Sequence, residues 1–201
     1  MFLKSPPQLI LASTSRYRKE LLARLGLAFS CMTPGVDETP AAGEAPAALI
    51  ARLARAKAAA VAAREPGAWV IGSDQVAVLH ASAAPTILGK PDTEAQCRSQ
   101  LRSCSGRRVE FLTAVAVMHR ESNSVSEFMD RTSVSFRTLD DAVIERYVAK
   151  ERPLDCAGGF KSEGLGIALC ESIESADPTG LIGLPLIGLS AALRTAGFAL
   201  P

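Results

Sequence analysis

Asp74 is a carboxylate in the middle of an apolar run. Residues 69–79 read WVIGSDQVAVL, with β-branched residues before and after the polar centre, which is typical of a mostly buried strand. A buried carboxylate needs a cation, a metal or hydrogen-bond donors beside it. Asp74 either caps or kinks the strand, or points into a pocket to hold a metal or accept a proton. Gly72 indicates a bulge or a close backbone approach at the same place.

The segment 9–26 predicts a strand, a polar turn and a helix. Ser15 is a suitable N-cap and Gly26 a suitable C′ residue. Arg18 and Lys19 fall in the first helical turn, where cations oppose the helix dipole. Two interpretations stay open: an anion binds at this helix N-terminus, or this is an ordinary capped helix with a solvated basic face.

Lys57 falls on the apolar face of a helix predicted over residues 46–65. The nearby Arg52 and Arg55 fall outside that face at 100° per residue. Lys57 either snorkels to an edge or points into a charged pocket, and the pocket is slightly favoured. Before this helix, residues 36–40 (VDETP) form an acidic turn that, taken alone, is best interpreted as a solvated loop.

The middle of the chain carries weaker chemical signals. Residues 80–88 read as a loop without clear chemistry. Thr93 and Gln96 form a capping box for a helix that continues through Leu101. Residues 110–118 and 128–136 predict two strands of a hairpin, joined by the turn 121–124.

The last third contains a glycine-rich loop at residues 156–166, which brackets Lys161 and Glu163. It follows an amphipathic helix capped by Asp140. Residues 167–169 are expected to continue the loop as a strand. Pro185 starts a final helix that Gly197 ends.

The alternation of strands and helices predicts an α/β fold, with a mixed sheet because of the hairpin. The chain of 201 residues is 48% hydrophobic and 21% charged, so it can bury a sizeable core. One domain over residues 1–201 is expected, since domains run to about 100–200 residues.

Composition excludes several classes. A net charge of +1 argues against nucleic acid as a partner of the whole surface. The five cysteines form no CxxC pair and predict a reducing, cytoplasmic location. No signal peptide is expected in residues 1–7, and no apolar run approaches a membrane span. His80 and His119 are too scattered for a metal cluster.

Four ordered segments carry a family resemblance: LASTSRYRKELL, VDETP, GSDQV followed by GKP, and CAGGFKSEG followed by GLP. Together they resemble the Maf-like nucleotide pyrophosphatases from Leu9 to about Gly197. GSDQV and KSEG are similar to the subfamily that acts on 7-methyl-GTP, whereas relatives of the GADTV type favour dTTP and UTP. The resemblance implies an elongated mixed sheet flanked by helices, with two lobes around a nucleotide cleft.

The resemblance also implies an activity. A nucleoside triphosphate is hydrolysed between its α and β phosphates, releasing a monophosphate and pyrophosphate, with Mg²⁺ or Mn²⁺ as cofactor. Asp74 matches the family's proton acceptor and would share the metal with Glu38. Phosphate binding falls on four residues: Ser13, Arg18, Lys57 and Lys90. Members tend to form homodimers, so a homodimer is a candidate assembly.

Base choice falls, by the same resemblance, on Tyr17, Gln75 and Glu163. Methylation at N7 places a positive charge on guanine, and an aromatic ring attracts such a cation by about 0.5–2 kcal/mol. A carboxylate at Glu163 would accept from the guanine N–H edge and balance the charge.

The chain departs from the family pattern at several positions. Arg16 stands where proline is common. Lys19 replaces a second arginine, which removes bidentate phosphate contact. Tyr17 stands where a close relative would carry tryptophan. The loop 80–88 is long for the subfamily. Two alternative functions follow from the family: a pyrophosphatase of broader specificity, or a nucleotide-binding regulator of septum formation.

Overall fold

The computed structural model describes residues 7–80 and 85–201. The expectation about a signal peptide therefore falls almost wholly outside the described residues, as does the centre of the 80–88 loop. Among the described helices, none is long and apolar enough to cross a membrane.

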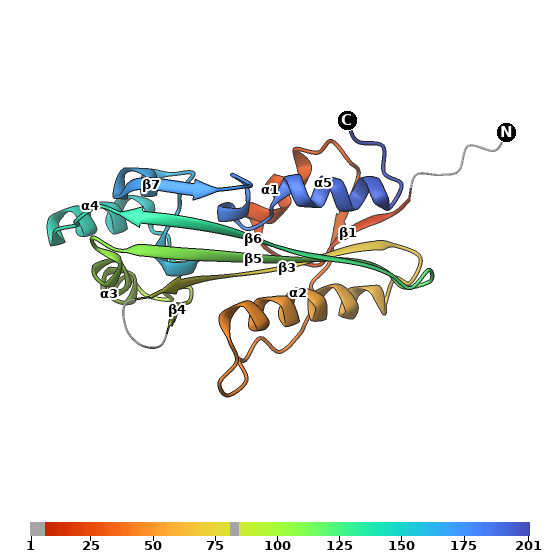
Figure 1. Ribbon diagram of the computed structural model, residues 1–201, viewed down its shortest axis with the longest axis horizontal. Coiled ribbons are helices and arrows are strands. Elements are labelled where there is room, and N and C mark those ends of the chain that lie inside the picture. Colours follow the sequence, from red (N-terminus) through yellow and green to blue (C-terminus); the bar gives the residue numbers. More distant parts are fainter. Residues whose placement is uncertain (1–6, 81–84) are drawn as a thin grey trace. The chain divides into compact units, whose positions relative to one another are not determined.

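The chain forms an α/β fold with a seven-stranded mixed sheet (Figure 1). The strand order is β2-β1-β3-β5-β6-β7, and β4 pairs with β3. β1 runs parallel to β2 and β3, whereas β4 and β7 run antiparallel to their partners. The predicted fold class is confirmed. The strands are β1 (Leu9–Leu11), β2 (Ser30–Cys31), β3 (Trp69–Leu79), β4 (Thr86–Leu88), β5 (Arg108–His119), β6 (Ser124–Phe136) and β7 (Cys170–Ser175).

The helices follow the capping signals closely. Ser15, Thr93 and Asp140 each accept a backbone N–H at a helix N-terminus, and Thr93 forms the predicted capping box with Gln96. The α-helices are α1 (Arg16–Ala23), α2 (Pro46–Ala62), α3 (Glu94–Cys104), α4 (Asp141–Glu151) and α5 (Leu186–Thr195). Three short 3₁₀ helices are η1 (Ala157–Gly159), η2 (Leu165–Leu169) and η3 (Gly180–Ile182).

Three local predictions were wrong. Gly26 is not the C′ residue of α1, because the helix already ends at the C-cap Arg24; Gly26 instead takes a left-handed turn conformation with φ +68°. Residues 167–169 belong to η2, since the backbone of Gly166 bonds to Lys161 and keeps this stretch curled. Residues 86–88 form β4 rather than loop, because Thr86, Ile87 and Leu88 pair with the end of β3.

The described chain divides into two compact units. Unit 1 comprises the described residues up to Asp74, together with Thr113–Met129 and Gly183–Pro201; unit 2 comprises the described parts of Gln75–Leu112 and Asp130–Ile182. The boundaries fall inside β3, β5 and β6, so neither unit is one continuous stretch. A single domain over residues 1–201 stays a prediction.

In unit 1, α2 covers one face of the sheet and α5 the other (Figure 1). A Cβ on Gly72 of β3 would lie 2.2 Å from the Ala54 carbonyl oxygen and 2.6 Å from the Ala58 nitrogen. The predicted close backbone approach at Gly72 is therefore confirmed, and it brings α2 against the polar centre of β3. The largest fully buried side chains here include Leu11, Ile50, Ile71, Leu184 and Leu189.

Unit 2 has its own apolar core, formed where α3 and α4 pack beside the strands. Phe160 lies at its centre, with ring centroids 5.7 Å from Phe111 and 5.1 Å from Phe136. Phe160 thereby anchors the glycine-rich segment 156–166 just before Lys161 and Glu163.

Candidate functional site

Asp74 lies buried on β3 and is held by a buried lysine. Its Oδ1 accepts a hydrogen bond from Lys57 Nζ at 2.6 Å, and the two residues are 7% and 5% exposed. Residues 72 and 74 share one face of the strand because side chains alternate, and that face meets α2. Lys57 thus points toward charged groups, and Asp74 has the neighbouring cation that a buried carboxylate needs. The role of Asp74 as a base or metal ligand stays a prediction.

Glu38 completes a three-charge group. Lys57 Nζ lies 2.8 Å from Glu38 Oε1, so one ammonium bridges a buried and an exposed carboxylate. The acidic turn is therefore more than a solvated loop. Glu44 ties this loop to α2, because its carboxylate accepts from both the Nε and the Nη2 of Arg52 at 2.7 and 2.8 Å.

The turn before α1 is built around two serine hydroxyls. Ser13 is buried, and its Oγ accepts from the Ser15 backbone N–H at 3.1 Å. Ser15 in turn caps the helix by accepting from the Arg18 N–H. The turn thus holds a buried hydroxyl directly before a helix N-terminus.

Arg18 is half-buried and belongs to the same charge cluster. Its Nε donates to the Gly183 carbonyl at 3.0 Å, and the Ser73 hydroxyl donates to that same oxygen at 3.1 Å. Burial lowers the pKa of the Arg18 guanidinium from its ordinary value, while the negative charges of Asp74 and Glu38 oppose that shift. Unit 1 therefore brings Arg18, Glu38, Lys57 and Asp74 into one electrostatic cluster. Ser13 lies in the turn just before the helix that carries Arg18.

Tyr17 already contacts a cation. The Arg16 guanidinium carbon lies 4.7 Å from the centroid of the Tyr17 ring, and Arg16 Nη2 donates to the Tyr17 hydroxyl at 2.6 Å. The departure from proline at position 16 thus supplies a charge to the face of this ring. Lys19, which also departs from the family pattern, is exposed.

Glu163, in unit 2, lines a pocket of about 360 Å³. Its side chain is exposed, and its hydrogen-bond contact is with the neighbouring Ser162 Oγ at 3.4 Å. Ser162 also lines it, and the other lining residues are largely apolar and come from β7 and the residues after it: Ile173, Ser175, Pro178, Leu181 and Ile182. An apolar pocket with a carboxylate at its edge suits a flat ring that carries N–H donors.

Gln75 reaches this pocket indirectly. Its Nε2 donates to the carbonyls of Gly180 and Leu181, each at 3.0 Å. Leu181 lines the same pocket as Glu163, so Gln75 fixes a wall of the pocket. Lys90 is exposed and follows Gly89 in the turn after β4.

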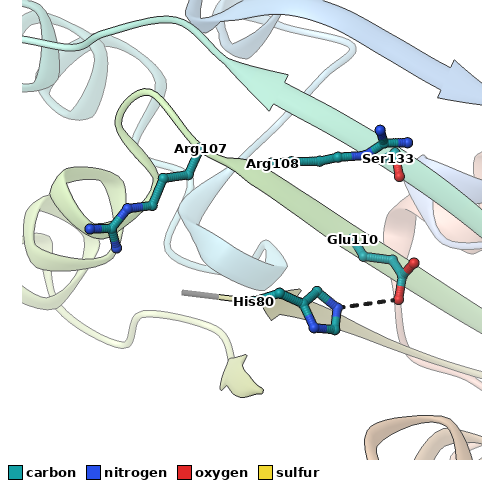
Figure 2. A pocket seen from close by; sticks show the side chains of 5 residues that line it. All are labelled: His80, Arg107, Arg108, Glu110 and Ser133. Carbon is teal, nitrogen blue, oxygen red and sulfur yellow. Dashed lines mark ion pairs between the residues drawn. The ribbon is translucent and has the colours of Figure 1, made fainter. Parts of the chain in front are cut away.

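A second pocket in unit 2, of about 350 Å³, contains none of the predicted site residues. Figure 2 shows His80 and Glu110 facing each other, with Nε2 and Oε2 3.6 Å apart, whereas Arg107 points away from them. Arg131 also pairs with Glu110 at 2.5 Å. These contacts make this pocket an ion-pair surface.

The comparison with protein families agrees with the ordered motifs. The model of the family described as "Maf-like protein" matches residues 8–196. The chain belongs to the Maf-like family.

Several relatives of this Maf-like chain carry the name 7-methyl-GTP pyrophosphatase. That of Xanthomonas oryzae pv. oryzae (strain MAFF 311018) is 57% identical over 97% of this chain and 100% of the relative. The proteins of Bordetella pertussis and Nitrosococcus oceani are 53% and 47% identical, each over 96% of this chain and over 94% and 96% of the relative. Among solved structures, the Staphylococcus aureus Ham1 protein aligns with a TM-score of 0.47 and 14% identity over 64% of this chain and 71% of that chain.

The two carboxylates that the resemblance assigns to a divalent cation are Asp74 and Glu38. In the part of the chain that the structure describes, no group of three or more His, Cys, Asp or Glu side chains could hold a metal. Mg²⁺ often needs only one or two protein carboxylates when substrate phosphates supply further oxygens. Asp74 and Glu38 both bond to the Lys57 ammonium, so two carboxylates lie close to one another in unit 1.

Sequence reasoning missed several residues that hold the predicted site residues in place within each unit. The Gly183 carbonyl, which receives Ser73 and Arg18, has no side-chain signal. The apolar lining from Ile173 to Ile182 reads in sequence as ordinary core and turn. Glu151, whose carboxylate holds the segment around Glu163, reads as a polar residue at a helix end.

Proposed function

We propose that this Maf-like chain is a nucleoside triphosphate pyrophosphatase that hydrolyses 7-methyl-GTP to 7-methyl-GMP and pyrophosphate. The observation that carries the proposal is the buried Asp74 carboxylate on β3, paired with Lys57 beside Arg18 and Glu38. A cluster of cations around one buried carboxylate suits phosphate chemistry, which depends mainly on positioning and charge stabilisation. The name shared by the relatives at 47–57% identity supports the choice of substrate.

In the proposed reaction Asp74 is the general base. It accepts a proton from a water molecule, whose oxygen bonds to one of the two phosphorus atoms that share the α,β-bridging oxygen. The bond from that phosphorus to the bridging oxygen then breaks, which separates the monophosphate from pyrophosphate. Arg18, Lys57 and the Ser13 hydroxyl would bind phosphate oxygens, and Lys90 would add charge.

The metal is part of the proposal. Asp74 and Glu38 would hold Mg²⁺ or Mn²⁺ together with phosphate oxygens, and the cation would neutralise phosphate charge. Chelation with EDTA should therefore abolish pyrophosphate release, and restoring either cation should recover it. A cytoplasmic location and a homodimer stay predictions.

Base selection rests on the pocket that Glu163 lines. Its carboxylate would accept from the N–H edge of guanine, with Ser162 beside it and Leu181 and Ile182 as apolar walls. By the family resemblance, Tyr17 is a further candidate for favouring a methylated, cationic base over neutral guanine. Glu163→Gln should lower the preference for 7-methyl-GTP over GTP about tenfold, the effect of roughly 1.5 kcal/mol from a charge-assisted hydrogen bond. An unchanged ratio of kcat/KM would count against this role.

A substrate panel tests the function directly. Pyrophosphate release should be fastest from 7-methyl-GTP when compared with GTP, dTTP and UTP. Asp74→Asn should reduce kcat by about 10²–10⁴-fold, whereas Asp141→Asn, an exposed change on α4, should leave it unaltered. Equal rates on all four nucleotides would favour the broader pyrophosphatase, and full activity of Asp74→Asn would remove the proposed mechanism.

A further inference from the structure

The segment 161–166, here termed the Glu163 loop, is held by a single carboxylate from α4. Glu151 Oε1 accepts from Lys161 Nζ at 2.7 Å, and Glu151 Oε2 accepts from the Leu165 backbone N–H at 2.7 Å. The Glu151 side chain is only 11% exposed. One carboxylate therefore fixes the chain on both sides of Glu163.

Tyr147 holds the entry to the Glu163 loop from the same helix. Its buried hydroxyl accepts from the Lys161 backbone N–H at 3.0 Å and donates to the Gly159 carbonyl at 3.2 Å. Residues 147 and 151 lie four apart, so they share one face of α4. That face presents a hydroxyl and a carboxylate to successive parts of the loop.

The glycine content of the loop permits this contact. A Cβ on Gly164 would lie 2.5 Å from Glu151 Oε2, and a Cβ on Gly166 would lie 2.3 Å from the Lys161 carbonyl oxygen. Any larger residue at position 164 would have to displace the carboxylate. The loop sequence and Glu151 are thus sterically matched.

The charge of Glu151 is also stabilised. The hydrogen bond from Lys161, followed by that from the Leu165 N–H, lowers the pKa of the Glu151 carboxyl below its ordinary value. Glu151 is therefore ionised at neutral pH, as both of its contacts require.

Glu163 itself has little side-chain support. It is exposed, and its hydrogen-bond contact is with Ser162 in the same loop. Its direction is therefore set mainly by the loop backbone, which Glu151 and Tyr147 fix. A small displacement of the Glu163 carboxylate should weaken substrate recognition, because a binding group acts best when the protein already holds it in the bound geometry.

We propose that Glu151 is a positioning residue for base selection: by clamping Lys161 and Leu165, it aims Glu163 at the base pocket without touching substrate. The inference rests on the proposed function. The inference gives Glu151, a residue at the end of α4 and outside the Glu163 loop, a role in substrate specificity.

The test compares Glu151→Gln with wild type on 7-methyl-GTP and GTP. Glutamine keeps the side-chain volume, but its NH₂ group is a donor and cannot accept a hydrogen bond. It would therefore face either the Lys161 ammonium or the Leu165 N–H, and one of the two hydrogen bonds would be lost. The ratio of kcat/KM for 7-methyl-GTP over GTP should fall about fivefold, mostly through a higher KM for 7-methyl-GTP, while kcat changes less than about twofold. Glu145→Gln is the matched control: it lies on the same helix and pairs with Arg98 at 2.7 Å, away from the loop.

Lys161→Gln provides a second variant if Glu151→Gln fails to fold. It keeps the Glu151 bond to Leu165 and removes only the ammonium, so a smaller loss in the same direction is expected. The proposal is overturned if Glu151→Gln folds and leaves both the KM and the ratio of kcat/KM for 7-methyl-GTP over GTP unchanged. If Glu151→Gln does not fold, the same result for a folded Lys161→Gln overturns it.

Hydrogen exchange separates this inference from the proposed function. The Leu165 amide should exchange faster in Glu151→Gln than in wild type or Glu145→Gln. If wild type shows no preference for 7-methyl-GTP, the proposed function fails, yet faster exchange at Leu165 would still support the clamp. Unchanged exchange at Leu165 overturns the clamp, whatever the substrate.

Discussion

At the scale of single residues, the Lys57 ammonium is the centre of the site in unit 1. It lies between a buried carboxylate, Asp74, and an exposed one, Glu38. A lysine on the apolar face of α2 is costly unless its charge is compensated. Because Asp74 is buried as well, each residue depends on the other.

Breaking this pair should cost stability. Lys57→Met leaves the Asp74 carboxylate buried without its cation, so the free energy of unfolding should fall by about 3–5 kcal/mol. The double variant Lys57→Met/Asp74→Asn should lose less than the sum of the two single variants, by at least about 1 kcal/mol. Urea unfolding of the four proteins measures this coupling.

The exposed pair of Arg55 on α2 and Glu127 on β6 provides the control. Its arginine side chain is 64% exposed, so its coupling should be only about 0.2–1 kcal/mol. Strictly additive effects of Lys57→Met and Asp74→Asn would show that the two charges are not coupled.

At the scale of elements, the loop before α2 carries Glu38, and Glu44 anchors this loop to α2 through Arg52. The hydrogen bonds from Arg52 and then from the Ala41 N–H lower the pKa of Glu44 from 4.5 to about 2. A depressed folded-state pKa means that the stabilisation is fully present above about pH 4.5 and is lost as the pH falls toward 2.

Glu44→Gln should therefore lower the urea midpoint most at pH 7, and the difference from wild type should shrink steadily between pH 4.5 and 3. Urea titrations at pH 7, 4.5 and 3 measure it, with Glu20→Gln, an exposed change on α1, as the control for charge alone. If the difference in urea midpoint between wild type and Glu44→Gln stays constant from pH 7 to 3, the Glu44 carboxyl does not titrate in this range.

The contact of α2 with β3 makes a second prediction at this scale. Gly72→Ala would drive a methyl group into the backbone of α2 at Ala54 and Ala58, which should destabilise the protein by about 2–3 kcal/mol. Activity should also fall, because α2 carries Lys57 and β3 carries Asp74. Thermal unfolding and pyrophosphate release measure the two effects.

Gly67→Ala is the matched control for Gly72→Ala. A Cβ there would meet the Glu121 side chain at 3.5 Å, an ordinary contact, so stability should change by less than about 0.5 kcal/mol. Equal stability of the two alanine variants would contradict the packing argument.

At the scale of the whole molecule, the two compact units share three continuous strands. Since β3, β5 and β6 each pass from one unit into the other, neither unit can unfold without breaking strands of the other. The chain should therefore unfold in one cooperative transition.

The single tryptophan, Trp69, reports on unit 1, where it stacks on His119 with ring centroids 5.0 Å apart. Its fluorescence in urea should change at the same midpoint as the hydrogen-exchange protection of α3 and α4 in unit 2. Two separate midpoints would mean that the units unfold independently and would also contradict one domain over residues 1–201.

The sequence alone determined the features that depend on neighbours along the chain. Cap residues and strand periodicity predicted the α-helices and β3, because capping bonds and side-chain alternation are local. The same local rules failed at residues 86–88 and 167–169, where strand pairing and a backbone bond across the loop decided the conformation.

Asp74 and Lys57 were identifiable from sequence because a charge inside an apolar pattern is costly and therefore noticeable. Only the tertiary structure decided which charges meet: that Lys57 bridges Asp74 and Glu38, and that Glu151 clamps the Glu163 loop. Such partners lie on different elements, and their distance in space is fixed by packing that local sequence patterns do not encode.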